Sequence, residues 1–204
     1  MDAAKTQANL LQLYLIRHGE TEWALSGKHT GRTDIGLTPH GEEQARSLAQ
    51  RLRNVQFTRV LTSPRLRARR TCELAGVLPA AEVEPDLAEW DYGDFEGKLT
   101  AEIYQVQPDW NIFRDGCPHG ESPAEIAARA DRLIARLTTL TGNVALFSHG
   151  HFGCALAARW AELPILAGQR FALDPASLNI LGHQARHPDL RVITLWNSPS
   201  LAKP

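Results

Sequence analysis

Residues 10–21 read Leu10-Leu11-Gln12-Leu13-Tyr14-Leu15-Ile16-Arg17-His18-Gly19-Glu20-Thr21, an apolar run that ends in Arg-His-Gly. An apolar run of this length predicts a buried strand. The pattern returns at residues 144–150, where Val-Ala-Leu-Phe is followed by Ser-His-Gly. In an open α/β sheet, functional groups gather just beyond the carboxyl ends of the strands. We therefore expect His18 and His149 to lie close together, although they are far apart in the sequence.

Short apolar runs alternate with helical patterns along the whole chain. Strands are predicted at residues 11–16, 58–62, 143–148, 177–182 and 190–196, with a weaker one at 81–85. Apolar residues recur at helical spacing over 45–52 and 126–140, and Thr38, Ser63 and Ser122, each followed by proline, predict capped helix starts. This alternation predicts one α/β domain over residues 1–204, a three-layer α/β/α sandwich with a mainly parallel sheet and helices on both faces.

Residues 86–121 fit no strand-helix unit. They are rich in aromatic residues, glycine and acids. Segments of this kind that interrupt a regular fold are often functional. We interpret them as an excursion over the mouth of the active site.

The composition limits the class of protein and its partners. The chain has 204 residues with 43% hydrophobic and 22% charged side chains, which is typical of a globular protein. A net charge of -1 argues against a dedicated nucleic-acid or membrane-surface protein. Three cysteines without paired or metal-site spacing, no signal peptide and no apolar run long enough to span a membrane predict a cytoplasmic location. A homodimer through a sheet edge is compatible with the sequence but not required by it.

The two histidines and nearby arginines have the residue types that phosphoryl transfer needs. His18 is a candidate nucleophile, because neighbouring cations would keep its imidazole neutral. Arg17 and Arg67 can each form paired hydrogen bonds to phosphate oxygens, and His149 can donate another. A single histidine beside a strand is more often structural, and the arginines of residues 65–70 more often form a solvated helix face. The conjunction of these groups favours a phosphate pocket.

Five blocks of sequence, in order, resemble those of the histidine phosphatase superfamily, the phosphoglycerate-mutase-like proteins. The first is 15–21, the segment that carries Arg17-His18-Gly19. The others are 31–41 with Gly31-Arg32-Thr33-Asp34, 63–71 with Ser63-Pro64 and Arg67, 87–97 with Glu89, and Ser148-His149-Gly150. The resemblance covers nearly the whole chain and implies the fold of that family.

The resemblance also implies a role for each matching residue. His18 would be the nucleophile that becomes phosphohistidine, and Glu89 the acid that protonates the leaving alcohol and then the base that activates water. The phosphoryl group would be held by Arg17, Arg67, His149, Gly150, Thr30 and Gly31. We expect no cofactor and no metal, since the sequence has no cluster of metal ligands.

Departures from the family's mutases favour hydrolysis over transfer. The family's mutases have a sequence similar to Glu-Arg-His-Tyr-Gly where this chain has residues 89–93. Trp90 stands in place of a carboxylate-binding arginine, and the next residue, Asp91, would repel a carboxylate. The chain also lacks the length of the mutases' insertion. Ala24 replaces an asparagine that contacts phosphate in many members, and Thr30 and Gly31 would compensate. We therefore expect a metal-independent phosphomonoesterase. A cofactor-dependent phosphoglycerate mutase is the alternative, and a non-catalytic binding protein is disfavoured because all five catalytic candidates are present.

The sequence leaves the substrate open. Bacterial acid phosphatases of about this length and sedoheptulose-bisphosphatase-like proteins are the most similar subgroups, and both act on small phosphomonoesters. An aryl or sugar leaving group, or a phosphohistidine protein, is compatible with the pattern. His151 is interpreted as a pocket-rim or structural residue. The candidates for the lining of the mouth are Trp23, Tyr92, Phe95, Trp110, Phe113, Arg114 and His119.

Overall fold

A single mixed sheet organises the fold. The computed structural model describes residues 10–77 and 79–200. The strands are β1 (Gln12–Arg17), β2 (Phe57–Thr62), β3 (Glu82–Val83), β4 (Asn143–Ser148), β5 (Leu178–Gln184) and β6 (His187–Ser198). Their order is β3-β2-β4-β1-β5-β6, and the first four run parallel. β5 pairs antiparallel with β1, and β6 antiparallel with β5. The mainly parallel sheet is confirmed, with an antiparallel hairpin added at one edge.

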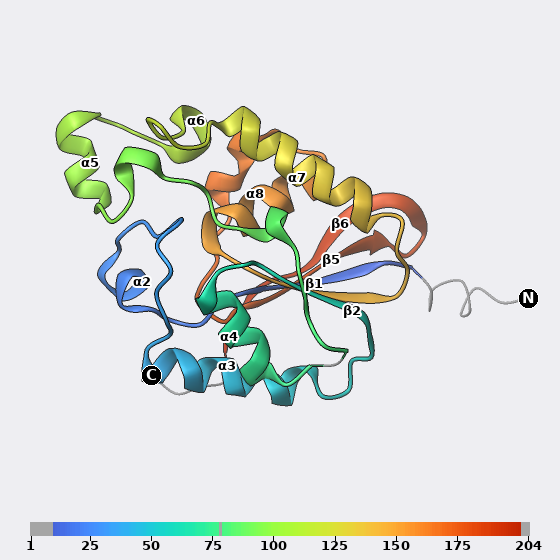
Figure 1. Cartoon of the computed structure of the whole chain (residues 1–204). Helices are drawn as coiled ribbons and strands as arrows, with labels where there is room; N and C mark the ends of the chain where they lie inside the picture. The colour runs from blue at the N-terminus through green and yellow to red at the C-terminus, as the bar shows by residue number, and fades with distance from the viewer. Residues whose placement is uncertain (1–9, 78, 201–204) are drawn as a thin grey trace, which may run out of the picture.

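Two pairs of helices cover the two faces of this sheet (Figure 1). Helices α3 (Pro39–Leu52) and α4 (Leu66–Ala75) lie on one face, and α7 (Pro123–Leu137) and α8 (Gly150–Trp160) on the other. Successive side chains of a strand point to opposite faces. Leu13 and Leu15 accordingly pack with α7 and α8, while Tyr14 and Ile16 pack with α3 and α4. Both faces of β1 are therefore buried, which explains its continuous apolar sequence and confirms the three-layer architecture.

Side chains cap two of the three predicted helix starts. Thr38 accepts a hydrogen bond from the Gly41 amide, and Ser122 forms a reciprocal capping box with Glu125. The predicted cap at Ser63 is wrong. Helix α4 begins at Leu66 after Arg65, and the amide of Leu66 donates to Oδ1 of Asp34 at 2.7 Å. The carboxylate of Asp34, from a distant loop, therefore caps this helix in place of Ser63, the residue that the sequence predicts.

Short elements stand in the connections between the strands and the four covering helices. They are α2 (Glu22–Ser26), η1 (Pro85–Leu87), η2 (Gly93–Phe95), α5 (Thr100–Val106), α6 (Ile112–Asp115) and η3 (Ile165–Arg170). The loop after α2 is joined to the 86–121 segment by backbone hydrogen bonds between His29 and both Gly97 and Lys98. No helix in residues 10–77 and 79–200 is long and apolar enough to cross a membrane.

Candidate active site

The adjacent strands β1 and β4 bring the two predicted histidines together. Arg17 and Ser148 are opposite each other in the parallel register, and the amide of His18 donates to the carbonyl of Ser148 at 3.0 Å. The next residue of each strand therefore leaves the sheet at the same point. The rings of His18 and His149 lie 5.2 Å apart, centroid to centroid, and both side chains are buried.

Hydrogen bonding fixes which nitrogen of His18 can react. Nδ1 lies 2.7 Å from the carbonyl oxygen of Gly19, so Nδ1 carries the proton and Nε2 keeps its lone pair. Burial, with the charges of Arg67 and Arg17, lowers the pKa of His18 well below its ordinary value of 6.5. Gly19 is required at this turn, because a Cβ there would lie 2.4 Å from the carbonyl oxygen of Gly41. The result is a neutral imidazole with a free Nε2.

Arg67 is held in place by backbone carbonyls. Its side chain is fully buried, and its terminal nitrogens donate to the carbonyls of Thr30, Gly31 and Thr33 at 2.8–3.2 Å. The amide of Gly31 in turn donates to Glu96. Thr30 and Gly31 thus orient the cation through their carbonyls, and the amide of Gly31 is already used within the loop.

Five buried side-chain atoms have no hydrogen-bond partner in the part of the chain that the structure describes, and three of them belong to predicted site residues next to His18. These three are Nε of Arg17, Nε of Arg67 and Nδ1 of His149, and the other two are Nε of Arg65 and Oγ of Ser177. Arg17 Nη1 donates to the carbonyl of Leu173, and His149 Nε2 pairs with Ser63 Oγ at 2.7 Å. Leaving a buried polar group unpaired costs about 1–3 kcal/mol. Three such atoms beside one another indicate a site shaped for an anion with several oxygens.

Glu89 lies at the amino end of helix α8. Its Oε1 accepts the amides of Trp90 and Phe152 at 2.9 and 2.8 Å, and its Oε2 accepts the amide of His151 at 3.2 Å. A Cβ on Gly150 would lie 3.5 Å from Arg17 Nε and 3.7 Å from Glu89 Oε2. Both atoms therefore border the space above Gly150, and Oε2, with one long hydrogen bond, is the oxygen available for proton transfer.

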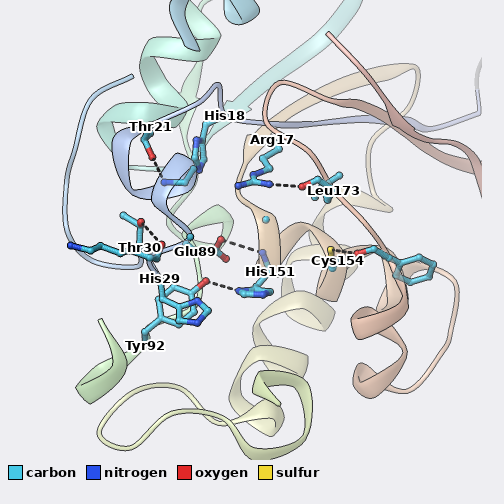
Figure 2. Close-up of a pocket in the computed structure, with 15 residues that line it drawn as sticks. Arg17, His18, Thr21, His29, Thr30, Glu89, Tyr92, His151, Cys154 and Leu173 are labelled. Carbon is cyan, nitrogen blue, oxygen red and sulfur yellow. Dashed lines mark hydrogen bonds between the residues drawn. The ribbon is translucent and has the colours of Figure 1, made fainter. Parts of the chain in front are cut away.

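A pocket of about 280 Å³ connects these groups with the surface (Figure 2). The residues lining it are Arg17, His18, Thr21, Ala24, Gly27, Lys28, His29, Thr30, Glu89, Tyr92, Gly150, His151, Cys154, Phe171 and Leu173. Of the predicted site residues, Arg67, His149 and Gly31 are absent from this lining. Arg67 and His149 each have a buried nitrogen without a partner among the described residues, whereas the amide of Gly31 is bound to Glu96.

Most of the aromatic residues predicted at the mouth belong to the core. Only Tyr92 of that set lines the pocket, whereas Phe95, Trp110 and Phe113 are buried in the hydrophobic core. Trp90 is also buried, with its indole nitrogen donating to the carbonyl of Glu121. Neither it nor Asp91 faces the pocket.

The charged residues that the sequence left undecided pair on the outside of the molecule. Asp91 forms an ion pair with Arg32 at 2.7 Å, and Arg114 pairs with Asp115 at 2.8 Å. His119 is exposed and contacts Asp94. Asp91 is paired with Arg32 and is absent from the pocket lining, so the arrangement does not support the predicted repulsion of a substrate carboxylate by Asp91.

Several pocket residues are not among the predicted site residues. They are Lys28, His29, Cys154, Phe171 and Leu173, which come from a loop, from the interior of a helix and from the segment before β5. None stands at a strand end, where the sequence predicts functional groups. His151, interpreted as a rim or structural residue, lines the pocket and pairs with Tyr92.

The described residues contain no group of three or more His, Cys, Asp or Glu side chains that could hold a metal ion. The charges around His18 come from arginines. The site thus has the features of an anion pocket with a neutral imidazole at its base and a carboxyl group at its side.

Comparison with known proteins identifies the family. Residues 13–197 match the Histidine phosphatase superfamily (branch 1), and the chain belongs to this family of phosphatases. The chain is 43% identical to an acid phosphatase of Mycobacterium tuberculosis over 192 residues, which are 92% of this chain and 94% of that protein. It is 39% identical to sedoheptulose 1,7-bisphosphatase of Saccharomyces cerevisiae over 184 residues, 74% of this chain and 68% of that one. A solved structure of a Mycobacterium tuberculosis open reading frame superposes with a TM-score of 0.85 at 39% identity, covering 92% of this chain and 97% of the other.

Proposed function

We propose that the chain is a metal-independent phosphomonoesterase that works through a phosphohistidine. His18 Nε2 attacks phosphorus, the ester P–O bond breaks, and the leaving oxygen takes the proton from Glu89. Glu89, now a carboxylate, then takes a proton from a water molecule whose oxygen attacks phosphorus. The N–P bond breaks, inorganic phosphate leaves, and His18 and protonated Glu89 are restored. Small sugar phosphates are the class of substrate that we assign.

The observation that carries this proposal is the set of unpaired buried atoms on Arg17, Arg67 and His149. A phosphoryl group on His18 offers three equatorial oxygens, and in the transition state their charge needs fixed donors. The two arginines keep their positive charge, and His149 adds a third group from the carboxyl end of the neighbouring strand β4. No hydrogen bond of these atoms to other groups has to break when the phosphoryl group binds.

The position of Glu89 supports its role as proton donor. The space above Gly150 is bordered by both Arg17 Nε and Glu89 Oε2. A leaving oxygen on a phosphoryl group bound by Arg17 therefore comes within reach of the carboxyl group. The first step requires His18 neutral and Glu89 protonated, so the rate should be highest at acidic to neutral pH. The lowered pKa of His18 keeps the nucleophile neutral in that range.

Hydrolysis of an aryl phosphate from about pH 4 to 8, with excess chelator, tests the proposal in wild type and in His18→Ala. The variant should lose at least about a thousandfold in rate, because the covalent route is gone. Alkaline quenching, which preserves phosphohistidine, followed by mass analysis should find one added phosphoryl group on the wild type alone. Strong inhibition by chelator, or turnover in His18→Ala, would contradict the mechanism.

The phosphoglycerate mutase alternative has Lys28 in its favour, a pocket cation without an ion pair among the described residues. A mutase primed with a bisphosphate would isomerise phosphoglycerate without net release of phosphate. The phosphatase would release phosphate from simple esters without a primer. Measuring both products in one reaction separates the two activities.

A further inference from the structure

The outer part of the pocket has two chemically different walls. His29, Tyr92 and His151 form a polar wall, and Cys154, Phe171 and Leu173 form an apolar one. The phosphoryl mechanism uses none of these side chains. In Figure 2 the polar wall lies below Glu89, on the side away from His18. Whatever alcohol the phosphate is attached to has to lie between the two walls.

A short hydrogen bond fixes the orientation of His151. Its Nδ1 lies 2.6 Å from the hydroxyl of Tyr92, and its own amide donates to Oε2 of Glu89. Nε2 makes no hydrogen bond to any residue within 10–77 and 79–200. Because Nδ1 is committed to Tyr92, Nε2 is the atom of this ring that remains for a ligand, one residue along the helix from the space above Gly150.

The polar wall is rigid and uncharged. The ring of His29 lies 4.9 Å from that of Tyr92 and 5.8 Å from that of His151. Burial lowers the pKa of both histidines to about 4, and it raises the pKa of Tyr92 well above 10. All three groups are therefore mostly neutral once the pH is well above 4, which covers most of the range where the enzyme is expected to work. Neutral, positioned hydrogen-bonding groups select hydroxyls rather than a second anion.

We propose that His151, held by Tyr92 and supported by His29, binds a hydroxyl of the alcohol part of the substrate, and that the substrates are small polyol or sugar phosphates. The apolar wall then contacts the C–H groups of the same alcohol. A volume near 280 Å³ is just below the usual range for small-molecule sites, so the alcohol is small. This inference depends on the proposed phosphatase activity and adds to it the residue that recognises the alcohol part of the substrate.

Glycerol 1-phosphate and n-propyl phosphate make a matched pair of substrates, since they differ only in hydroxyl groups. Wild type should prefer glycerol 1-phosphate, and His151→Phe should reduce that preference in kcat/KM about tenfold, the value of one neutral hydrogen bond. The rate with n-propyl phosphate should change little. Tyr92→Phe, which frees His151 to rotate, should reduce the preference less, and His151→Gln, which retains a hydrogen-bonding group, should restore part of it.

His187→Phe is the matched control, because His187 is exposed at the start of β6 and is absent from the pocket lining. Its preference should equal that of wild type. An equal loss for both substrates in His151→Phe would show a general effect on Glu89 and overturn the inference, as would an unchanged preference. If His151→Phe does not fold, the preference of Tyr92→Phe decides in the same way. Absence of phosphate release from both esters by wild type would instead contradict the proposed function itself.

Discussion

Replacing Arg129 by methionine should weaken both the fold and the proton donor. Arg129 extends from helix α7 and is 8% exposed. Its Nη1 donates to the carbonyls of Asp86 and Ala88 at 2.9 and 2.7 Å, and its Nη2 to that of Glu89 at 3.3 Å. Two further hydrogen bonds, each of 2.9 Å, join it to the carboxylate of Glu121. One side chain thus holds the backbone that carries Glu89.

The size of the effect follows from the groups that would be left unpaired. Breaking a buried ion pair by removing one partner costs about 3–5 kcal/mol. Glu121 is partly open to solvent at 24% side-chain exposure, so the lower end, about 3 kcal/mol, applies. For a protein of this length each kcal/mol moves the midpoint of thermal unfolding by roughly 2–4 °C. Arg129→Met should therefore unfold about 6–12 °C below wild type.

The effect on catalysis should depend on the leaving group. The guanidinium also lies over the ring of Phe152, 4.3 Å from its centroid, and the amide of Phe152 binds Oε1 of Glu89. Without Arg129, both the loop and the helix end that orient the carboxyl group are released. Misplacing a catalytic group by about 1 Å can cost a hundredfold. An alkyl phosphate, whose alkoxide needs a proton, should lose about a hundredfold in kcat, and p-nitrophenyl phosphate about tenfold or less.

The assay is kcat for both esters at a temperature where circular dichroism shows the variant folded. Arg132→Met is the control, since Arg132 lies on the same helix and pairs with the carboxylate of Asp86 at 2.7 Å while 56% exposed. An exposed pair contributes about 0–1 kcal/mol, so this variant should resemble wild type. Equal losses for the alkyl and aryl esters in Arg129→Met, or equal unfolding midpoints for the two variants, would contradict this role of Arg129.

Three further predictions concern the pocket and its titration. Glu89→Gln should lower kcat for alkyl phosphates at least about a hundredfold and for aryl phosphates much less, measured by phosphate release. Gly150→Ala should fold normally, because the added Cβ meets Arg17 Nε at 3.5 Å, but the methyl group should raise the inhibition constant of inorganic phosphate about tenfold. His29 and His151 have pKa values of about 4 when folded, below the ordinary 6.5, so the unfolded chain binds protons first. The midpoint of thermal unfolding should hence be constant above pH 7 and fall as the pH decreases from 6.5 to 4. In His151→Phe this fall should be less steep. Thermal unfolding followed at several pH values measures both.

The strands could be predicted because a strand that is buried on both faces has a continuous run of apolar residues. The predicted strand at 11–16 is observed at Gln12–Arg17, and that at 143–148 at the same residues. The direction of a strand has no comparable sequence pattern. The β5–β6 hairpin has apolar residues much like those of the parallel strands, and its antiparallel pairing appears only in the register. The start of α4 could not be predicted either, since its cap comes from Asp34, thirty-two residues upstream.

The position of the candidate site could be predicted, but not the full set of residues that line it. Residues at strand ends are recognisable because parallel strands deliver them to one edge of the sheet. Side chains such as His29 and Cys154 reach the pocket from a loop and a helix interior, where no spacing rule applies. Aromatic residues mislead for a related reason: Trp110 and Phe113 fill the core beneath the pocket, and aromatic rings are used in cores and mouths alike.

The unpaired nitrogens around His18 destabilise the free protein and remain available to a bound phosphate. Burial without a carboxylate partner is unfavourable for a guanidinium, yet no carboxylate contacts Arg17 or Arg67 within hydrogen-bond distance in the described residues. Backbone carbonyls accept hydrogen bonds from Nη1 of Arg17 and from both terminal nitrogens of Arg67, and each Nε has no partner among the described residues. A carboxylate in that place would stabilise the free protein, but it would compete with a phosphate dianion for the same donors. The fold instead keeps its nearest carboxylate, Glu89, bound to the end of helix α8, close enough to transfer a proton and without a contact to either arginine's open nitrogen.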